Sequence, residues 1–423
     1  MFKIQTHWQI IIAIILAVVV GLSCSPETQL FGAPIISYFD FLGKVFLNAL
    51  KMLIVPLIFS SIASGVASLG GVKGFGRLGM KTGIYYVATS IVAILIGLIA
   101  VNTIKPGFVN GIPGQEIFPI SPNTAAKLTQ IGDRGLGDLV QIFIRMVPPN
   151  ILDAATSNGN MLGIIFFSLV FGFFITKMQN RELQKHMENS VQGLSDVMML
   201  ITQWVMKFAP YGVFGLVAKT VTSTGMESFS SLAKFFVTVM IALSVHFLIV
   251  MPLILKFVAG VNPWRHYAAM KEALLCAFST SSSSATLPIT MKCVEAAGVS
   301  KKTSSFVLPL GATINMDGTA LFECVAAMFI AQAYGVDMSF ITQFLVVSLA
   351  LLTSIGVAGI PSASLVAIVV ILNNIGVPEE GIGILFAVDR ILDMCRTSVN
   401  VFSDSCGAIV IAKSEGETGI LTS

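Results

Sequence analysis

The stretch FSTSSSSATLP, residues 278 to 288, interrupts an apolar part of the chain with six consecutive Ser and Thr residues. It lies within 19 uncharged residues between Glu272 and Lys292, which is enough for one membrane crossing. A full crossing would place Lys292 and the next two lysines on the side opposite to the other basic loops. We therefore predict a re-entrant hairpin that breaks at the Ser/Thr run, with Pro288 near the start of its second arm.

The composition is that of an integral membrane protein built from helices. Only 11% of the 423 residues are charged, whereas about a quarter are charged in soluble domains. Residues 4–26, 82–104 and 154–176 contain no Asp, Glu, Lys or Arg, and about 20 apolar residues span a bilayer. Helices rather than a barrel are expected. The net charge of +3 gives no support for a nucleic-acid partner.

Basic loops predict how the chain is oriented. The segment 70–81 has three basic residues and no acidic one, and Lys177, Arg181 and Lys185 follow the fourth apolar stretch. Both loops are expected to be cytoplasmic, which places both chain termini there as well. The expected spans before the first hairpin are 8–24, 45–69, 83–103, 161–178, 197–221 (interrupted by Lys207) and 235–258.

A second interrupted apolar segment predicts a second hairpin. Residues 338–378 are uncharged, and SIGVAGIPSAS, residues 354–364, breaks them into two arms that are short for a crossing. The charge pattern predicts entry from outside. Two opposed hairpins are typical of secondary transporters built from inverted repeats with a site at the bilayer midplane. The fold expected is thus an all-α membrane protein with eight transmembrane helices and two opposed re-entrant hairpins. The alternative, two flexible linkers between full helices, disagrees with the charge pattern.

Polar residues follow the first hairpin in LPLGATINMDGTALFEC, residues 308–324. Ionisable side chains cost at least about 2.5 to 3.5 kcal/mol at the centre of a membrane helix, so they mark sites or pathways. Gly311 and Gly318 permit an unwound stretch whose carbonyl oxygens bind a hard cation. We predict a cation site at NMDG.

The last apolar segment, VDRILDMCRTSVNVFSD, residues 388–404, carries a polar stripe about 120° wide on one helix face. Such a stripe cannot face lipid. Besides binding a ligand, these charges have two alternative roles. They could form mutual ion pairs along the helix, as between Asp389 and Arg390, or an arginine could pair with Glu323. The stripe consists of Asp389, Arg390, Asp393, Arg396, Thr397, Asn400 and Asp404.

A cation and an anion on adjacent helical turns suit a zwitterion. The planar guanidinium of Arg396 is suited to binding a carboxylate, and Asp393 to binding an amino group. Hydroxyls and backbone amides of the Ser-rich tip offer a place for a second carboxylate. This arrangement predicts an acidic amino acid as the substrate.

The motifs SSSSATLP, GATINMDGT, SIGVAGIP and DMCRTSVNVFSD occur in an order and spacing that resemble the dicarboxylate/amino acid:cation symporter family, the sodium-coupled glutamate and aspartate transporters. The resemblance implies the glutamate-transporter fold and a role for each matching residue. Arg396 and Thr319 would bind the side-chain carboxylate, Asp393 the amino group, and Asn400 with Ser283 the α-carboxylate. The expected substrate-binding residues are Ser282, Ser283, Thr319, Ile360, Asp393, Arg396, Thr397 and Asn400.

The resemblance also implies several sodium sites. The first would contain Thr313, Ser354 and Ile355; the second Gly311, Asn315, Asn400 and Asp404; the third Tyr86, Thr89, Ser90, Asn315 and Asp317. Glu323 stands where archaeal members have Gln and eukaryotic members have an acidic residue proposed to carry a proton. Na⁺ and H⁺ are therefore the expected coupled ions. Ser281 departs from the arginine of archaeal first hairpins, and Ser362 and Ser364 replace glycines common in the second tip.

The resemblance further implies a homotrimer in a bilayer and a transporter rather than an enzyme. The sequence has no Asn-x-Ser/Thr sequon, which favours a bacterial inner membrane. The expected division is 1–82, scaffold helices 1 and 2; 83–150, transport-part helix 3 and an external loop; 151–262, scaffold helices 4 and 5 with transport-part helix 6; and 263–423, the transport core. Three alternatives stay open. A C4-dicarboxylate carrier would not need Asp393, a neutral amino acid carrier would leave Arg396 without a carboxylate, and an ion channel would bind its ions weakly along an open path.

Overall fold

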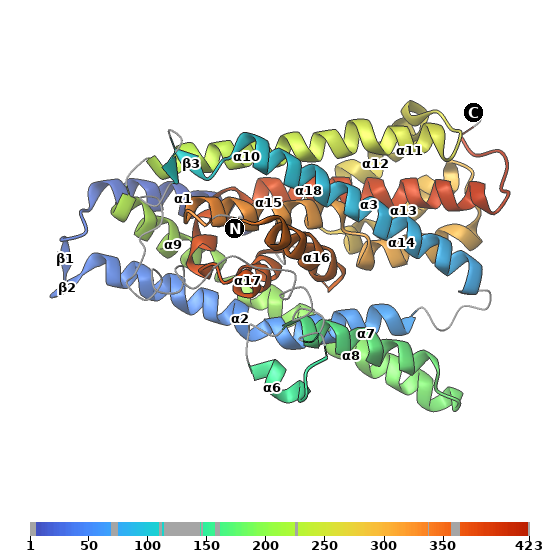
Figure 1. Ribbon diagram of the computed structural model, residues 1–423, viewed down its shortest axis with the longest axis horizontal. Helices are drawn as coiled ribbons and strands as arrows, with labels where there is room; N and C mark the ends of the chain where they lie inside the picture. The colour runs from blue at the N-terminus through green and yellow to red at the C-terminus, as the bar shows by residue number, and fades with distance from the viewer. Residues whose placement is uncertain are drawn as a thin grey trace, which may run out of the picture.

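The computed structural model describes residues 6–68, 75–109, 112–113, 144, 147–156, 161–224, 227–336, 338–356 and 364–421. Within them the chain is mostly helical, and most helices run roughly along the long axis of the molecule (Figure 1). Two pairs of two-residue antiparallel strands close short turns: β1 (Gln29–Leu30) with β2 (Ala33–Pro34), and β3 (Phe108–Val109) with β4 (Ile112–Pro113).

Helices from the first half of the chain form one packed group. In it α1 packs on α9, and α2 packs on α7, α8 and α9. The short helix α6 (Ile151–Thr156) contacts α7. The group consists of α1 (Thr6–Ser23), α2 (Ile35–Ser68), α7 (Met161–Thr176), α8 (Arg181–Met206) and α9 (Ala209–Thr224).

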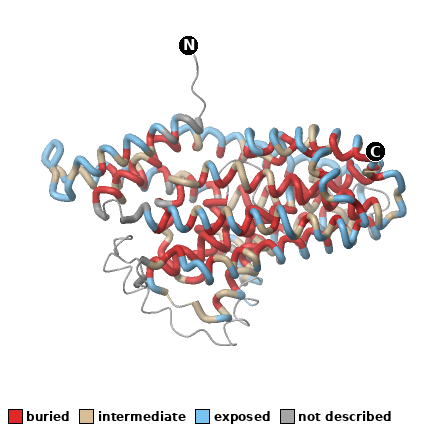
Figure 2. The backbone as a smooth tube through the Cα atoms, turned by 90° about the horizontal axis from the view of Figure 1, so that it is seen from above, coloured by how far each residue is buried: buried red, intermediate tan, exposed pale blue. Residues whose placement is uncertain are grey.

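The second group is centred on α15 (Asp317–Ala333), in which every residue is buried. Contacts with α15 come from α3, α10, α16, α17 and α18. Figure 2 shows the buried residues running through the interior of the molecule. The other members are α3 (Phe75–Ile104), α10 (Glu227–Val245), η3 (His246–Val250), α11 (Met251–Phe257), α12 (Pro263–Thr280), α13 (Ser283–Ala296), α14 (Lys301–Ile314), α16 (Phe340–Gly356), α17 (Ser364–Ile375), η4 (Glu379–Gly381) and α18 (Ile382–Ser414).

Both predicted interruptions separate two helices that pack on each other. The first pair, α12 and α13, is divided at Ser281 and Ser282, and Ser281 adopts a left-handed conformation with φ of 51°. Pro288 lies inside α13, one and a half turns after its start. The second pair, α16 and α17, flanks residues 357–363, which lie outside the described residues. In Figure 1, α12 and α13 lie toward the end that carries the C-terminus, whereas α16 and α17 lie nearer the middle of the molecule.

Four described helical stretches are long and apolar enough to cross a membrane: Ile35–Ala67, Arg77–Ile104, Ser230–Phe257 and Lys301–Ala333. A fifth follows if α8 and α9, bent by 53° at their break, are counted together. The single span expected at 197–221 is therefore two helices, because the chain turns at Lys207 and Phe208. The described residues support a multi-pass membrane protein, and the count of eight stays a prediction.

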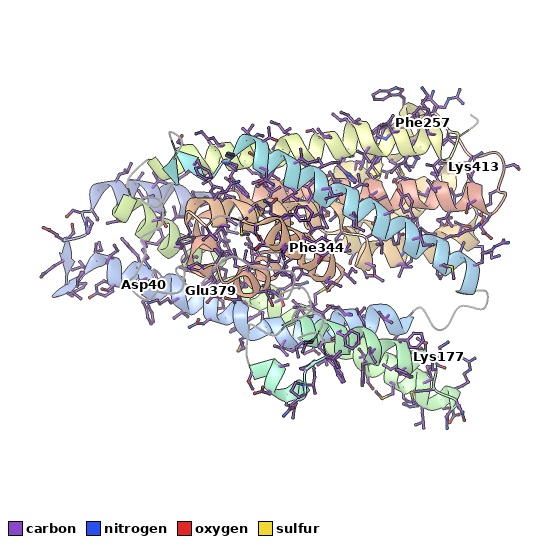
Figure 3. The ribbon with its side chains drawn as sticks, viewed as in Figure 1. Asp40, Lys177, Phe257, Phe344, Glu379 and Lys413 are labelled. Carbon is purple, nitrogen blue, oxygen red and sulfur yellow. The ribbon has the colours of Figure 1, made fainter. Side chains whose placement is uncertain are left out.

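Charged side chains lie at both ends of the molecule. In Figure 3, Lys177 and Lys413 lie near one end of the molecule, and Asp40 and Glu379 lie near the other. The pair α12 and α13 lies toward the Lys413 end. Both ends also carry the opposite charge, since Lys44 and Lys219 pair with Asp40 and Glu415 pairs with Arg77 and Lys81, so the orientation of the chain stays a prediction.

Candidate functional site

Arg396 lies fully buried near the middle of α18. Its Nη2 atom donates hydrogen bonds to Asp389 Oδ1 at 2.9 Å and to Asp393 Oδ1 at 2.8 Å, and its Cζ atom lies 3.8 Å from the centre of the Phe322 ring. Nε and Nη1 have no hydrogen-bond partner among the described residues. Buried donors are normally paired, so these two nitrogens indicate a place for an anionic ligand.

The charges on α18 form mutual ion pairs, which is one of the alternatives that the sequence left open. Asp389 bonds to Arg396, seven residues later, while Nη1 of its neighbour Arg390 lies 3.9 Å from Asp393 Oδ2. Glu323, which was considered as a partner of one arginine, accepts a hydrogen bond from a threonine instead. Two carboxylates thus balance two guanidinium groups before any ligand enters.

An oxygen-rich cluster surrounds Asp317 at the start of α15. Ser90 donates to Asp317 Oδ1 at 2.6 Å, and Thr89 Oγ1 lies 3.4 Å from both Asp317 Oδ1 and Asn315 Oδ1. The Tyr86 hydroxyl, from the same face of α3, donates to the carbonyl oxygen of Val307 at 2.7 Å. The structure therefore brings α3 and the 315–317 break together, as the third expected sodium site requires. Its donor set fits Na⁺, because a hard cation prefers oxygen ligands.

A second carboxylate, Asp404, lies next to this cluster. Asn315 Nδ2 donates to Asp404 Oδ1 at 2.9 Å. A Cβ atom on Gly311 would stand 2.4 Å from the same oxygen, so only glycine permits the close approach of α14 and α18 here. Asn400, expected in this site as well, uses its amide elsewhere: Oδ1 accepts from the backbone N–H of Gly318 at 2.7 Å, and Nδ2 donates to Thr319 Oγ1 at 3.0 Å.

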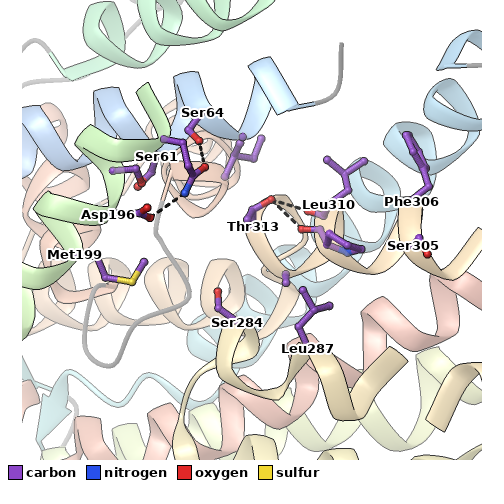
Figure 4. A pocket seen from close by; sticks show the side chains of 16 residues that line it. Ser61, Ser64, Asp196, Met199, Ser284, Leu287, Ser305, Phe306, Leu310 and Thr313 are labelled. Atoms are coloured by element: carbon purple, nitrogen blue, oxygen red, sulfur yellow. Dashed lines mark hydrogen bonds between the residues drawn. The ribbon is translucent and has the colours of Figure 1, made fainter. Parts of the chain in front are cut away.

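Two of the three residues of the first expected sodium site line a cavity of about 530 Å³. Thr313 of α14 and Ile355 of α16 both line it, while the Ser354 hydroxyl donates to the Leu351 carbonyl within α16. Figure 4 shows Thr313 and Ser284 opposite Ser61, Ser64 and Asp196. The cavity therefore lies between the second helix group and α2 and α8 of the first.

The expected substrate residues are distributed over three places. Arg396, Asp393, Thr397, Asn400 and Thr319 are buried on the facing sides of α18 and α15. At the first break, the Ser282 side chain accepts from the backbone N–H of Ala285 and so caps α13, and Ser283 is buried. Ile360 lies outside the described residues.

Glu323 is fully buried on α15. Its Oε2 atom accepts a hydrogen bond of 2.7 Å from Thr353 of α16, and its Oε1 atom has no hydrogen-bond partner among the described residues. Glu323 therefore contacts the first arm of the second helix pair.

Sequence reasoning missed two contacts of Asp317. His246 Nε2 lies 3.1 Å from Asp317 Oδ2, and Ser403 donates to the same oxygen at 2.6 Å. His246 begins η3, a wider helical turn between α10 and α11. A fully buried histidine in an apolar run was a usable signal, since ionisable groups in membrane segments mark sites. Ser403 gave no such signal, because its partner lies 86 residues away in the chain.

Known proteins resemble this chain over nearly its whole length. The model of the sodium:dicarboxylate symporter family matches residues 6–414. The chain is 36% identical over 418 residues to the proton/sodium-glutamate symport protein of Geobacillus stearothermophilus, covering 99% of this chain and 96% of that protein. The proton/glutamate-aspartate symporter of Escherichia coli (strain K12) is 33% identical over 413 residues, covering 98% and 93%. Excitatory amino acid transporter 3 of Mus musculus is 36% identical over 455 residues, covering 97% and 86%. The motifs, the family match and these relatives agree: the chain belongs to the sodium:dicarboxylate symporter family.

Proposed function

We propose that this protein is a secondary active symporter that imports L-glutamate or L-aspartate, driven by a sodium gradient and accompanied by a proton. The relatives named as proton/sodium-glutamate and proton/glutamate-aspartate symporters support this substrate class and these ions. No catalytic chemistry is part of the proposal.

The observation that carries the proposal is the unfinished hydrogen bonding of Arg396. Two buried guanidinium nitrogens have no partner among the described residues, whereas the third is shared by Asp389 and Asp393. A carboxylate binds a guanidinium through two parallel hydrogen bonds. The side-chain carboxylate of an acidic amino acid would supply this partner, and Asp393 would be close enough to take up the amino group.

The oxygen clusters at Asp317 and Asp404 supply the sodium part of the proposal. Buried carboxylates are costly without a counter-charge, and the described partners of these two carboxylates are neutral hydroxyls, an amide and a histidine. Na⁺ would act here as co-transported cargo. Several ions are needed for strong accumulation, since a tenfold gradient of one ion supplies only about 1.4 kcal/mol.

We further propose Glu323 as the proton carrier, because it is a fully buried acid in contact with the second helix pair. Glu323→Gln keeps the shape of the side chain but cannot bind or release a proton. If that variant retains the wild-type response of uptake to an imposed pH gradient, the proton role of Glu323 is wrong.

Transport by alternating access requires two parts that move against each other. We propose that α1, α2, α7, α8 and α9 belong to a static scaffold, and that α3, α10 and the helices from α12 to α18 belong to the moving part. Packing within each group supports this division. We also propose a homotrimer in a bacterial inner membrane, with both termini cytoplasmic and the helix pairs as opposed re-entrant hairpins.

The deciding test is uptake of radiolabelled L-glutamate and L-aspartate into proteoliposomes, with Na⁺ and pH gradients imposed separately and together. We expect saturable uptake that requires Na⁺ and is increased by an inward proton gradient. Uptake that ignores Na⁺ would exclude sodium coupling. Preference for succinate over both amino acids would instead indicate a dicarboxylate carrier.

A further inference from the structure

A hydroxyl group of α16 contacts the buried carboxyl group of α15. Thr353 Oγ1 lies 2.7 Å from Glu323 Oε2, and the two residues are 2% and 0% exposed. The same Oγ1 atom lies 2.8 Å from the carbonyl oxygen of Leu349, one turn earlier in α16. Thr353 therefore touches a possible acceptor on each side.

The number of hydrogens limits how these contacts can be satisfied. A hydroxyl has one hydrogen to donate and lone pairs with which to accept. The Leu349 carbonyl can only accept. Both contacts are therefore full hydrogen bonds together when Glu323 is protonated and donates to Thr353, while Thr353 donates to Leu349. When Glu323 is ionised, the Thr353 hydrogen must turn toward it, and the bond to Leu349 is given up.

The charged groups around Glu323 are few. Arg396 of α18 acts on it electrostatically, and Cys324 is its titratable neighbour on α15. The sequences of α16 and α17 contain no charged residue. The described charged side chains of α3 and α10, and the histidine of η3, have partners elsewhere: Arg77 and Lys81 bond to Glu415, Lys234 lies near the Phe108 carbonyl, and His246 contacts Asp317. Among the described residues, the hydrogen-bond partner of Glu323 is Thr353.

We propose that Thr353 is a positioning residue that couples the placement of α16 to proton binding at Glu323. Its hydroxyl can partner either form of Glu323 by turning one hydrogen, so the proton can be loaded and released without leaving the facing oxygen unbonded. Movement of α16 away from α15 removes this partner from both forms. The proton comes from water on one side and returns to water on the other. This inference rests on the proposed role of Glu323.

The test compares Thr353→Val, Thr353→Ser and Ser348→Ala in proteoliposomes of the full chain. Ser348 is the matched control, because its hydroxyl donates to the Phe344 carbonyl one turn earlier on the same helix, whereas the described hydrogen bond to Glu323 comes from Thr353. Two readouts are measured: the pH profile of Na⁺-driven L-glutamate uptake, and the infrared carboxylic-acid C=O band that Glu323→Gln removes.

We expect Thr353→Val to shift the infrared band and to move the pH midpoint of uptake upward by roughly one unit, because the ionised form loses the stronger, charge-assisted hydrogen bond. Thr353→Ser keeps the hydroxyl, so its infrared band and its pH midpoint should equal those of the wild type. Ser348→Ala should change neither the band nor the midpoint. In a Glu323→Gln background, Thr353→Val should no longer alter the pH profile. A wild-type band in Thr353→Val, or an equal shift in Ser348→Ala, overturns this inference alone. A Glu323→Gln variant that keeps the band and the pH response overturns the proton role of Glu323 and this inference with it.

Discussion

Gly311 offers a direct test of the proposed sodium sites. In Gly311→Ala, the new Cβ atom would stand 2.4 Å from Asp404 Oδ1 and 2.7 Å from the Tyr86 hydroxyl oxygen. A Cβ atom does not normally come within about 3 Å of another heavy atom, so one of the two partners must shift. Both partners are buried, and Tyr86 is held by its hydrogen bond to Val307. The Asp404 carboxylate is therefore expected to move out of position.

The size of the effect follows from the cost of overpacking. Adding one methyl group to a packed interior costs about 1 to 3 kcal/mol. If the clash is relieved by a shift of Asp404, this free energy is lost from sodium binding. Each 1.4 kcal/mol corresponds to a tenfold change in affinity. We therefore expect sodium affinity to fall roughly 5- to 150-fold.

The assay is the thermal unfolding midpoint of purified protein as a function of Na⁺ concentration, with choline chloride holding the ionic strength constant. A bound ion stabilises the folded state by an amount that grows with the logarithm of its concentration relative to its Kd. The readout therefore reports sodium affinity and does not depend on the transported substrate. Gly83→Ala is the matched control. Gly83 lies on the same helix as Tyr86, and a Cβ atom on Gly83 would meet nothing within 4 Å. A sodium dependence of Gly311→Ala equal to that of the wild type would refute a cation site at Asp404.

Two further predictions concern charged contacts. Asp389→Asn leaves Arg396 with one carboxylate instead of two. Breaking a buried pair costs up to about 3 to 5 kcal/mol, so the unfolding midpoint should fall below that of the wild type. Saturating L-glutamate should reduce this difference in midpoint, because it supplies a carboxylate. Hydrogen bonds from Arg77 and then Lys81 lower the pKa of Glu415 to about 2. The ion pairs between Glu415 and α3 should therefore persist above about pH 4.5 and weaken as the pH falls toward about 2. Glu415→Gln should remove both pairs and leave the Lys81 bonds to Ser414, so it should lower the unfolding midpoint at neutral pH and not at about pH 2.

Local sequence chemistry predicted where the helices break. A run of hydroxyl residues competes with helical hydrogen bonding, and the chain does leave the helix at Ser281 in a left-handed conformation. The NMDG motif likewise separates α14 from α15 at Asn315 and Met316. The stripe on α18 was predictable because it depends only on helical periodicity, and six of its seven members are buried.

Contacts between distant segments were not predictable in the same way. The bonds from His246 and Ser403 to Asp317, and from Thr353 to Glu323, join residues far apart in sequence. Hydropathy describes one segment at a time, so it marks a polar residue without naming its partner. The bend at Lys207 was missed as a break for a related reason: a charged residue in an apolar window is compatible with either one bent span or two helices.

The arrangement of α15 against α18 gives a physical basis for coupling ions to substrate. The backbone N–H of Gly318 donates to Asn400, and a Cβ atom on Gly318 would stand 2.7 Å from the carbonyl oxygen of Arg396. Gly318 directly follows Asp317, so one residue in close contact joins the oxygen cluster to the backbone of Arg396. A cation bound at the 315–317 break would order this segment. The contact between Gly318 and α18 would then be fixed, and with it the position of Arg396 relative to α15. Coupling between two binding sites is reciprocal. By whatever factor a cation at Asp317 raises the affinity of Arg396 for an anion, an anion bound at Arg396 should raise the affinity of Asp317 for the cation by the same factor.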